Sequence, residues 1–273
     1  MTCRYAVIGN PIAHSRSPAI HAAFARQTGQ DLVYERVLGR RDGFASDVRH
    51  FLAEGGCGLN VTLPFKEEAW SLCDELSPRA AAARAVNTLI PLTAEHLHGD
   101  NTDGIGLVRD LGRNHGFAFV GRRVLLLGAG GAARGVLLPL LETGLAELVI
   151  ANRTAGKAYA LAGAAESSGP VRGSGLDELA GAAFDLIVNA TSAGLAGEGP
   201  ALPGACLAPG GWAYDMVYGC AATPFLRWAQ AQGAGAALDG FGMLVEQAAE
   251  SFFLWRGVHP QTAEVIAELR GGD

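Results

Sequence analysis

The chain has 273 residues, of which 49% are hydrophobic and 18% charged, and its formal net charge at pH 7 is −6. This length accommodates one large domain or two smaller domains with separate cores. An acidic chain without a block of basic residues is poorly suited to nucleic acid, whose phosphates are bound by clustered Lys and Arg. No apolar run approaches the ~20 residues of a membrane-spanning helix, so we expect no membrane partner either.

The cysteines and the first residues bear on the cellular compartment. The five cysteines are Cys3, Cys57, Cys73, Cys206 and Cys220. No two have the spacing of a zinc knuckle, and an odd count without an export signal favours free thiols. Residues 1–9 contain no apolar run followed by a cleavage site, which predicts no signal peptide. We therefore expect a cytoplasmic protein.

Apolar strand-like segments alternate with helical segments along the first part of the chain. Strands are predicted at Tyr5–Gly9, Leu32–Val37, Gly58–Leu63 and Ala85–Ile90. Helices are predicted between them at Ser17–Gln27, Gly43–Glu54 and Phe65–Glu75. Ser17 precedes Pro18, a pairing typical of a capping hydroxyl before a first-turn proline. This alternation predicts an α/β lobe with a mostly parallel sheet.

A second alternating series follows the first. Its predicted strands are Arg123–Gly128, Glu147–Ala151, Phe184–Asn189 and Gly211–Met216. Its predicted helices are Gly131–Glu142 and Gly156–Glu166, and a last helical stretch runs from Gly242 to Leu269 with a break near Pro260. We predict two α/β lobes, residues 1–103 completed by residues 241–273, and residues 104–240. A cleft between such lobes is a usual ligand site.

A glycine turn in the second lobe has the pattern of a dinucleotide-binding site. The first predicted strand of this lobe ends at Gly128, and Gly130 and Ala133 complete a G-x-G-x-x-A pattern before the helix. The first glycine permits a tight turn, the second lets the backbone approach a pyrophosphate, and the alanine allows close helix–strand packing. The predicted pyrophosphate-binding residues are Gly128, Ala129, Gly130, Gly131 and Ala132.

The end of the next strand bears on which dinucleotide binds. An NAD enzyme places Asp or Glu there to bind the ribose 2′-hydroxyl. This chain has Asn152, Arg153 and Thr154 instead, followed by Lys157. Two cations and a hydroxyl suit a 2′-phosphate. The sequence therefore favours NADP(H) over NAD as the cofactor.

Polar motifs at the predicted strand ends resemble those of a known family. They occupy residues 9–18, 60–66, 85–88, 99–104, 189–194, 215–218, 223–225 and 239–248. In these segments the chain is similar to the shikimate dehydrogenases, NADP-dependent enzymes of aromatic amino-acid biosynthesis. The resemblance extends from residue 4 to about residue 253. It implies a Rossmann-type NADP-binding lobe, a substrate-binding lobe, and reversible reduction of 3-dehydroshikimate to shikimate in the pathway to chorismate.

The resemblance assigns catalysis to Lys66 and Asp103. When a hydride reaches a ring carbonyl, the developing alkoxide needs a proton and a positive neighbour. Lys66 can supply both, and Asp103 can orient it. The chain contains 19 arginines and only two lysines, Lys66 and Lys157. An ammonium group can release its proton whereas a guanidinium does not, which is consistent with a catalytic lysine.

The resemblance also implies substrate and cofactor contacts. The substrate carboxylate is expected on Ser15 and Ser17, with Tyr218 of the other lobe as a third donor. The predicted contacts of the ring hydroxyls are Asn60, Thr62, Lys66, Asn87, Asp103 and Gln247. Further cofactor contacts are predicted at Thr191, Met216 and Gly240.

Two alternatives remain open from the sequence. The first is a related dehydrogenase that prefers quinate or an amino analogue of shikimate. The second is a non-catalytic relative that senses the same ligands, although it would not need Lys66 and Asp103. We expect no metal site, because His96 and His98 share a strand face but have no third ligand nearby. The oligomeric state is left as monomer or homodimer.

Overall fold

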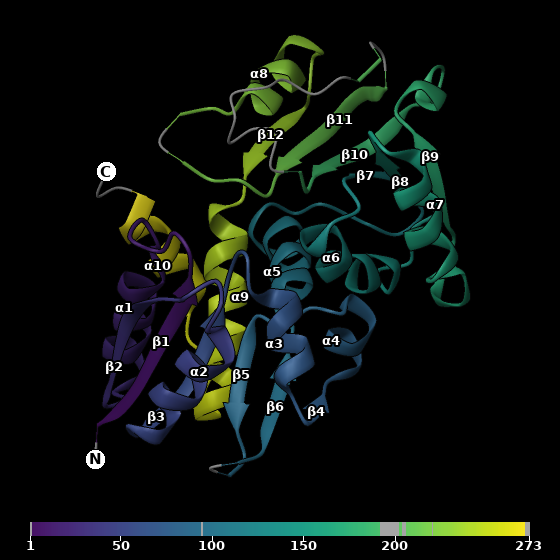
Figure 1. The fold of residues 1–273 in the computed structure, drawn as a ribbon. Helices are drawn as coiled ribbons and strands as arrows, with labels where there is room; N and C mark the ends of the chain where they lie inside the picture. The colour runs from purple at the N-terminus through teal and green to yellow at the C-terminus, as the bar shows by residue number, and fades with distance from the viewer. Residues whose placement is uncertain (1, 94, 192–201, 204–205, 220, 271–273) are drawn as a thin grey trace. The chain divides into compact units, whose positions relative to one another are not determined.

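The structure is a computed structural model that describes residues 2–93, 95–191, 202–203, 206–219 and 221–270. The chain forms two compact units (Figure 1). Unit 1 comprises residues 1–106 and 244–273, and unit 2 comprises residues 107–243. The two boundaries predicted from the sequence, after residues 103 and 240, each lie three residues before the boundaries between the units, after residues 106 and 243. Cys220 and residues 192–194 of one polar motif lie outside the described residues.

Unit 1 contains a mixed six-stranded sheet. Its strands are β1 (Cys3–Gly9), β2 (Leu32–Leu38), β3 (Gly56–Val61), β4 (Glu75–Leu76), β5 (Thr88–Pro91) and β6 (Leu97–Asp100). They lie in the order β2-β1-β3-β5-β6-β4. Strand β1 is parallel to β2 and β3, and β4 is parallel to β6. Strand β5 runs antiparallel to β3 and β6, so parallel pairs predominate in the sheet.

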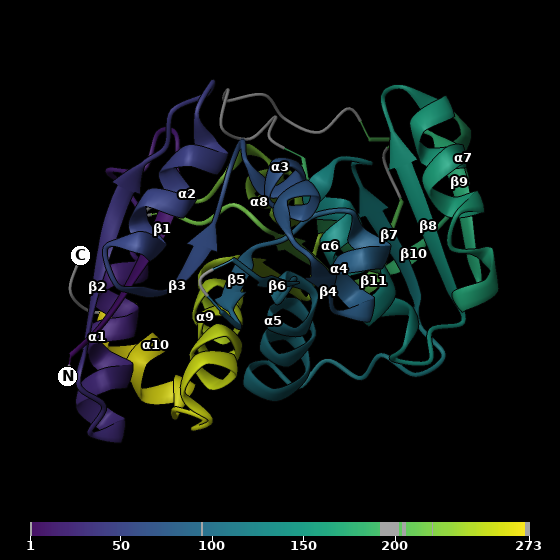
Figure 2. The same ribbon diagram turned by 60° about the horizontal axis from the view of Figure 1, so that its bottom comes forward.

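Helices of unit 1 pack around this sheet. They are α1 (Ser17–Thr28), α2 (Phe44–Ala53), α3 (Lys66–Leu72), α4 (Pro78–Ala83), the start of α5 (Asp103–Arg109), most of α9 (Phe241–Arg256), and α10 (Thr262–Arg270). Successive strand side chains point to opposite faces. Ala6 and Ile8 of β1 therefore pack against α2, while Tyr5 and Val7 pack on the other side with Trp255 of α9. Figure 2 shows α2 on one side of these strands and α1 with α9 on the other.

Unit 2 contains an all-parallel six-stranded sheet. Its strands are β7 (Arg123–Leu127), β8 (Glu147–Asn152), β9 (Val171–Gly175), β10 (Phe184–Asn189), β11 (Leu207–Asp215) and β12 (Ala236–Asp239). The order β12-β11-β10-β7-β8-β9 is the doubly wound arrangement of the Rossmann fold. The strand order reverses between β7 and β10. Ligands of such sheets bind beyond the carboxyl ends of the strands at this reversal.

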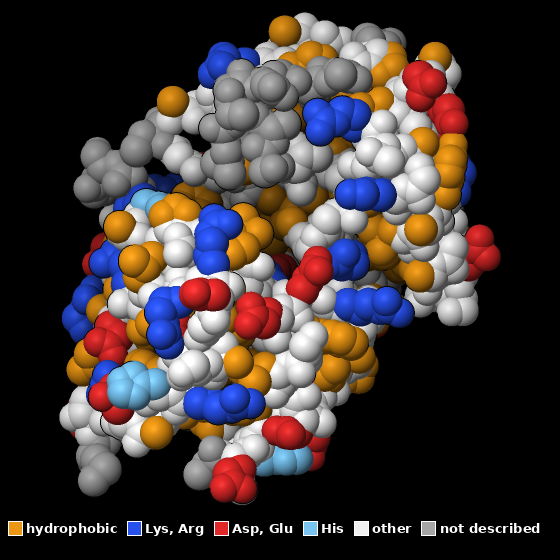
Figure 3. All heavy atoms as spheres, viewed as in Figure 1, with side chains coloured by type: hydrophobic (Ala, Val, Ile, Leu, Met, Phe, Trp, Pro, Cys, Tyr) orange, Lys and Arg blue, Asp and Glu red, His pale blue; other side chains and the backbone are white. Residues whose placement is uncertain are grey.

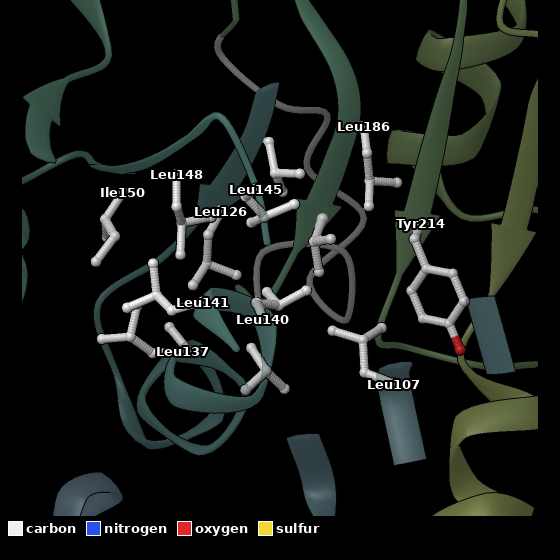
Figure 4. Packing of buried hydrophobic residues seen from close by; sticks show 14 of the residues in the cluster. Leu107, Leu126, Leu137, Leu140, Leu141, Leu145, Leu148, Ile150, Leu186 and Tyr214 are labelled. Atoms are coloured by element: carbon white, nitrogen blue, oxygen red, sulfur yellow. The ribbon is translucent and has the colours of Figure 1, made fainter. Parts of the chain in front are cut away.

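Helices on both faces give unit 2 two apolar cores. The helices are α6 (Gly131–Leu141), α7 (Ala155–Gly163) and α8 (Pro224–Ala231), with short helical turns at Asp110–Asn114, Glu166–Ser168 and Asp177–Leu179. Val124 and Leu126 of β7 point into the core beneath α6, whereas Leu125 and Leu127 point into the opposite core. Figure 4 shows Leu137, Leu140 and Leu141 of α6 packed against this first core. The predicted α/β class with a Rossmann-type lobe is confirmed.

The structure differs from the sequence prediction in several short elements. Strands β4, β9 and β12 and helices α4 and α8 were not predicted, and α3 ends at Leu72, before the predicted Glu75. The predicted capping role of Ser17 is wrong. Arg16 is the N-cap residue of α1, no side chain caps this helix, and Ser17 already lies in its first turn. The hydroxyl of Ser17 instead accepts a hydrogen bond from that of Ser15 at 3.2 Å.

One face of the molecule is mixed in charge, and the described helices include none that could span a membrane. Acidic and basic side chains are interspersed on the face shown in Figure 3. No helix among the described residues has both the length and the apolar character that a bilayer crossing requires.

A histidine is buried in the core of unit 1. His21 of α1 is 1% exposed, and its ring stacks on Tyr34 with centroids 4.0 Å apart. Neither ring nitrogen has a hydrogen-bond partner. Burial lowers the pKa of His21 to about 3, and the neighbouring Asn60 side chain offsets only part of this effect. The folded protein therefore holds this ring neutral, whereas the unfolded chain protonates it below about pH 6.5.

We expect His21 to make the protein less stable as the pH falls from about 6.5 towards 4.5. In this range the unfolded state binds a proton at His21 that the folded state does not bind. The unfolding free energy therefore decreases by about 1.4 kcal/mol for each unit by which the pH falls. His21→Phe keeps an aromatic ring for the Tyr34 stack and should flatten this slope. Urea unfolding between pH 7 and pH 4.5 measures the effect, and His50→Gln, at a side chain that is 74% exposed, is the control. Equal slopes for wild type and His21→Phe would contradict the assignment.

Candidate active site

An ion pair between Lys66 and Asp103 lies at the centre of the polar cluster in unit 1. Lys66 is the first residue of α3, five residues beyond the end of β3. Asp103 is the first residue of α5, three residues beyond the end of β6. The Lys66 Nζ atom lies 2.6 Å from Asp103 Oδ2, and the two side chains are 20% and 8% exposed. The two predicted catalytic residues are thus in direct contact, and the ammonium stays partly accessible.

Asn87 holds the other oxygen of Asp103. Its Nδ2 donates to Asp103 Oδ1 at 2.9 Å. Its Oδ1 accepts from the backbone N–H of Thr102 at 2.9 Å and from the hydroxyl of Thr88 at 2.8 Å. Because a backbone N–H can only donate, the contact with Thr102 fixes which way the Asn87 amide points. The Asp103 carboxylate is therefore held between an amide and an ammonium. Gln247 of α9 also comes within 3.2 Å of Asn87 Nδ2 through its Oε1.

A buried hydrogen-bond network supports Asn87 from behind. Asn60, which is 7% exposed, accepts from the Tyr34 hydroxyl at 2.7 Å. Its Nδ2 lies 3.0 Å from Ser251 Oγ, 3.0 Å from the Asn87 carbonyl oxygen and 3.2 Å from Thr88 Oγ1. Burial also raises the pKa of Tyr34 well above its usual range, so its hydroxyl stays protonated as a donor. Both polar atoms of the Asn60 side chain are therefore engaged with protein groups.

Sequence reasoning missed Tyr34, Thr88 and Ser251 as members of this network. Ser251 lies four residues after Gln247, so both occupy the same face of α9. That spacing of two polar side chains on a helix rich in alanine and phenylalanine is the one signal that the sequence offered.

The loop that carries Asp103 is anchored by a partly buried arginine. Arg79 of α4 binds Asp100 through Nε at 2.6 Å and Nη2 at 2.8 Å. Asp100 Oδ1 also accepts from the backbone N–H of Asn101 at 2.6 Å, and Asn101 Oδ1 accepts from the N–H of Asp103 at 3.1 Å. Asp100 is 3% exposed. This chain of contacts fixes the backbone leading from β6 into the start of α5.

The other predicted substrate residues occupy loops beyond the strand ends. Ser15 lies in the loop between β1 and α1 and Ser17 is the first residue of α1, with their hydroxyl oxygens 3.2 Å apart. Thr62 follows β3 and packs so closely on Gly9 that a Cβ there would lie 2.5 Å from its methyl carbon. Tyr218 belongs to unit 2, so it is described with that unit.

The glycine turn in unit 2 lies where the strand order reverses. Gly128 follows β7 with φ of 107°, a conformation that favours glycine. A Cβ there would lie 3.1 Å from the Ala190 carbonyl oxygen, just after β10. Among the described residues, a Cβ at Gly130 would meet nothing within 4 Å, and one at Gly131 would meet only the far end of Arg134. These residues leave the backbone from Gly130 into α6 uncovered, which fits the approach of a pyrophosphate.

The remaining predicted cofactor residues follow neighbouring strands of the same sheet. Asn152 ends β8, and its Nδ2 donates to the Thr154 carbonyl at 3.0 Å. Arg153, Thr154 and Lys157 are exposed at the start of α7, and neither cation forms an ion pair within the described residues. Exposed cations at a helix N-terminus oppose its dipole. They are therefore suited to an anionic ligand such as a 2′-phosphate.

A buried carboxylate organises the ends of β10 and β11. Asp215 accepts from Asn189 Nδ2 and from the Val217 N–H, each at 3.1 Å. Burial raises its pKa, and hydrogen bonds, the largest effect among them from Thr223, oppose this rise. Asn189 Oδ1 in turn accepts from the Thr191 N–H and hydroxyl. Thr191 is thereby fixed.

Met216 and Gly240 come together at the ends of β11 and β12. A Cβ at Gly240 would lie 2.3 Å from the Met216 carbonyl oxygen, so this close approach requires glycine. Tyr218 lies two residues beyond Met216, and its ring centroid is 6.2 Å from that of Phe241.

The predicted pair of histidines faces carboxylates. His96 Nε2 lies 3.1 Å from Glu75 Oε1, and His98 Nδ1 lies 3.8 Å from Glu75 Oε2. Across the part of the chain that the structure describes, no group of three or more His, Cys, Asp or Glu side chains is arranged to hold a metal ion.

Three family models match consecutive parts of the chain. Residues 7–89 match the shikimate dehydrogenase substrate binding domain, and residues 111–196 match the shikimate / quinate 5-dehydrogenase model. Residues 240–270 match the shikimate 5′-dehydrogenase C-terminal domain. The first match includes Lys66 and Asn87, and the second includes the glycine turn.

Full-length relatives and solved structures agree with these matches. The shikimate dehydrogenase (NADP(+)) of Alkalilimnicola ehrlichii is 60% identical over 270 residues, which cover 99% of each chain. The crystal structure of an Ael1 enzyme from Pseudomonas putida has a TM-score of 0.90 at 49% identity and covers 98% of each chain. Shikimate 5-dehydrogenase from Thermus thermophilus, in complex with NADP(H) and shikimate, has a TM-score of 0.87 at 35% identity and covers 99% of each chain. The family resemblance predicted from the motifs is thus confirmed, and the chain belongs to the shikimate dehydrogenase (NADP(+)) family.

Proposed function

We propose that the protein is an NADP-dependent shikimate dehydrogenase that reversibly reduces 3-dehydroshikimate to shikimate, on the route to chorismate and the aromatic amino acids. Family membership over the whole chain supports this activity. The observation that carries it is the contact of 2.6 Å between Lys66 Nζ and Asp103 Oδ2, with Asn87 on the second carboxylate oxygen. The four described cysteines are free thiols, in keeping with a cytoplasmic location.

The chemistry needs one proton for each hydride. NADPH, when bound, supplies the hydride to the ring carbonyl carbon of 3-dehydroshikimate. The carbonyl oxygen gains negative charge and takes a proton, for which Lys66 Nζ is the donor. Asp103 holds the ammonium in place and accepts a hydrogen bond from a neighbouring ring hydroxyl. In the reverse direction Lys66 takes the hydroxyl proton from shikimate.

Neutral polar side chains orient the substrate. Ser15 and Ser17 bind its carboxylate, and Tyr218 contributes a third hydroxyl from unit 2. Thr62, Asn87 and Gln247 can each donate and accept, which suits ring hydroxyls. Asn60 has both polar atoms engaged in the buried network, so its contribution is chiefly to hold Asn87.

Unit 2 holds the cofactor. The backbone of Gly128–Ala132 binds the pyrophosphate, in keeping with the uncovered turn at Gly130. Arg153, Thr154 and Lys157 bind the 2′-phosphate, and Asn152 shapes their loop through its bond to the Thr154 carbonyl. Thr191, Met216 and Gly240 line the neighbouring strand ends.

The activity is tested by following NADPH absorbance in both directions. We expect rapid NADPH oxidation with 3-dehydroshikimate, and in reverse a higher kcat/KM for shikimate than for quinate or an amino analogue of shikimate. NADP(+) should be strongly preferred to NAD(+). A higher kcat/KM for quinate or the amino analogue would assign the enzyme to that substrate instead. Binding of shikimate without turnover would indicate a ligand sensor.

A further inference from the structure

Arg36 of β2 holds the loop that carries Ser15. Its Nε and Nη2 donate to the Ser15 carbonyl oxygen at 3.0 Å and 2.6 Å. A guanidinium is planar and permanently charged, so two bonds to one acceptor fix both its position and its orientation. A positive charge is therefore held on the backbone carbonyl of Ser15, the residue whose hydroxyl contacts that of Ser17.

The β1–α1–β2 connection places Arg36 there. Strand β2 is parallel to β1, and Arg36 lies opposite Val7 in their register. Side chains two residues apart on a strand share a face, so Arg36 shares its face with Tyr34. Tyr34 reaches the buried Asn60, whereas Arg36, nearer the carboxyl end of β2, reaches the loop that enters α1.

The serines alone offer a carboxylate no charge. The Ser15 hydroxyl lies 3.2 Å from that of Ser17 and accepts from the Ser17 N–H at 3.3 Å. Arg16 is adjacent to both serines in the sequence, and Lys66 belongs to the proposed active site, but both cations have other partners. Arg16 donates to the Leu269 carbonyl at 2.8 Å, and Lys66 is paired with Asp103. Arg36 lies outside this loop in sequence and contacts it directly, through the Ser15 carbonyl oxygen.

We propose that Arg36 is a specificity-determining residue that selects substrates bearing a carboxylate. This inference rests on the proposed function. Arg36 acts through Ser15 and through its charge rather than by touching the reacting atoms. It fixes the loop so that the two hydroxyls face the anion, and its field stabilises the bound negative charge. The carboxylate is remote from the ring carbonyl, and its charge is the same in substrate and product. Arg36 should therefore affect binding more than turnover.

The test compares the acid with its uncharged methyl ester. Arg36→Gln keeps hydrogen-bond donors but removes the charge. Arg36→Lys keeps the charge but loses the paired Nε and Nη2 donors of the guanidinium. With shikimate and NADP(+), Arg36→Gln should raise KM by about tenfold at low salt, since fixed charges at this range interact appreciably. kcat should change less than about twofold. KM for methyl shikimate should be nearly the same in wild type and Arg36→Gln. Arg36→Lys should recover part of the affinity for the acid.

Ionic strength gives a second readout. KM of wild type for shikimate should rise with salt, and this rise should be smaller in Arg36→Gln, because screening acts on the charge that was removed. Arg40→Gln is the matched control. Arg40 is exposed in the same unit and paired with Asp47 at 2.7 Å, so its loss changes net charge equally without touching the serine loop.

The possible results separate the two proposals. Equal increases in KM for acid and ester in Arg36→Gln would show that Arg36 only supports the loop, which would overturn the charge role. An unchanged KM for the acid would overturn the inference altogether. A wild-type enzyme that oxidises neither compound would instead overturn the proposed function. Circular dichroism and thermal melting confirm that each variant is folded.

Discussion

Lys66→Ala should lower kcat by at least about 100-fold while changing KM modestly. This is the usual scale for loss of a general acid or base, because its contribution is larger in the transition state than in the ground state. The ammonium lies 2.6 Å from Asp103 and remains 20% exposed, so it can reach both a substrate oxygen and the carboxylate that positions it. Steady-state kinetics with 3-dehydroshikimate and NADPH measure the loss.

Two companion variants separate the proton from the charge. Lys66→Arg should restore little activity, because a guanidinium keeps the charge but does not release its proton. Ser15→Ala should show the opposite pattern to Lys66→Ala, with KM raised more than kcat is lowered, since a carboxylate contact is made equally in both states. A near-normal kcat for Lys66→Ala would transfer the proton-donating role to another group, with Asp103 the next candidate.

Arg153→Ala should reduce the preference for NADPH over NADH by several-fold to about a hundredfold. A charge-assisted hydrogen bond is worth ~1.5–3 kcal/mol, and only the 2′-phosphate of NADPH would lose it. KM for NADPH should rise, whereas the constants for NADH should stay almost the same. Arg153 is exposed before α7, so its removal leaves the sheet intact.

Arg172→Ala is the control for the change in net charge. Arg172 lies on β9 of the same unit and is paired with Glu147 at 2.6 Å. The Arg172→Ala variant should leave the preference for NADPH over NADH unchanged. If Arg153→Ala weakened the binding of NADPH and of NADH equally, the 2′-phosphate would have to be bound by another residue, and Lys157 would be the first to test.

The strands that the sequence predicted are those with strong apolar runs. Strand β7 was easy to predict because its Val and Leu side chains fill the cores on both faces of the sheet, which gives a continuous apolar run. Strand β9 was missed because two of its five residues are glycine. The structure explains one of them: a Cβ at Gly173 would lie 2.6 Å from the backbone of Tyr159 in α7. A close approach of that kind depends on tertiary packing and leaves no periodic pattern.

In the candidate site, the sequence singled out the Lys66–Asp103 pair but not the residues that support it. Lys66 and Asp103 lie in motifs at strand ends, where polar groups in an α/β sheet gather at one edge. Ser251 and Arg36 carry no such local signal. Ser251 reaches Asn60 across 191 positions of the chain, and Arg36 reads as an ordinary exposed strand residue until the Ser15 loop is placed beside it. The capping prediction for Ser17 failed for a related reason. Ser17 could cap α1 only if the helix began at Pro18, but α1 begins at Ser17 itself.

The division of the chain between the units has a consequence for biosynthesis. Unit 2 is one uninterrupted stretch of 137 residues, from 107 to 243, inserted between the two parts of unit 1. Gln247 and Ser251 are therefore made last, although they pack with Asn60 and Asn87, which are made early. At ~5–20 residues per second, a ribosome needs roughly 7–27 s to cross the insert. Unit 2 is completed during that interval, while the nascent unit 1 still lacks the C-terminal residues 244–273 that complete it.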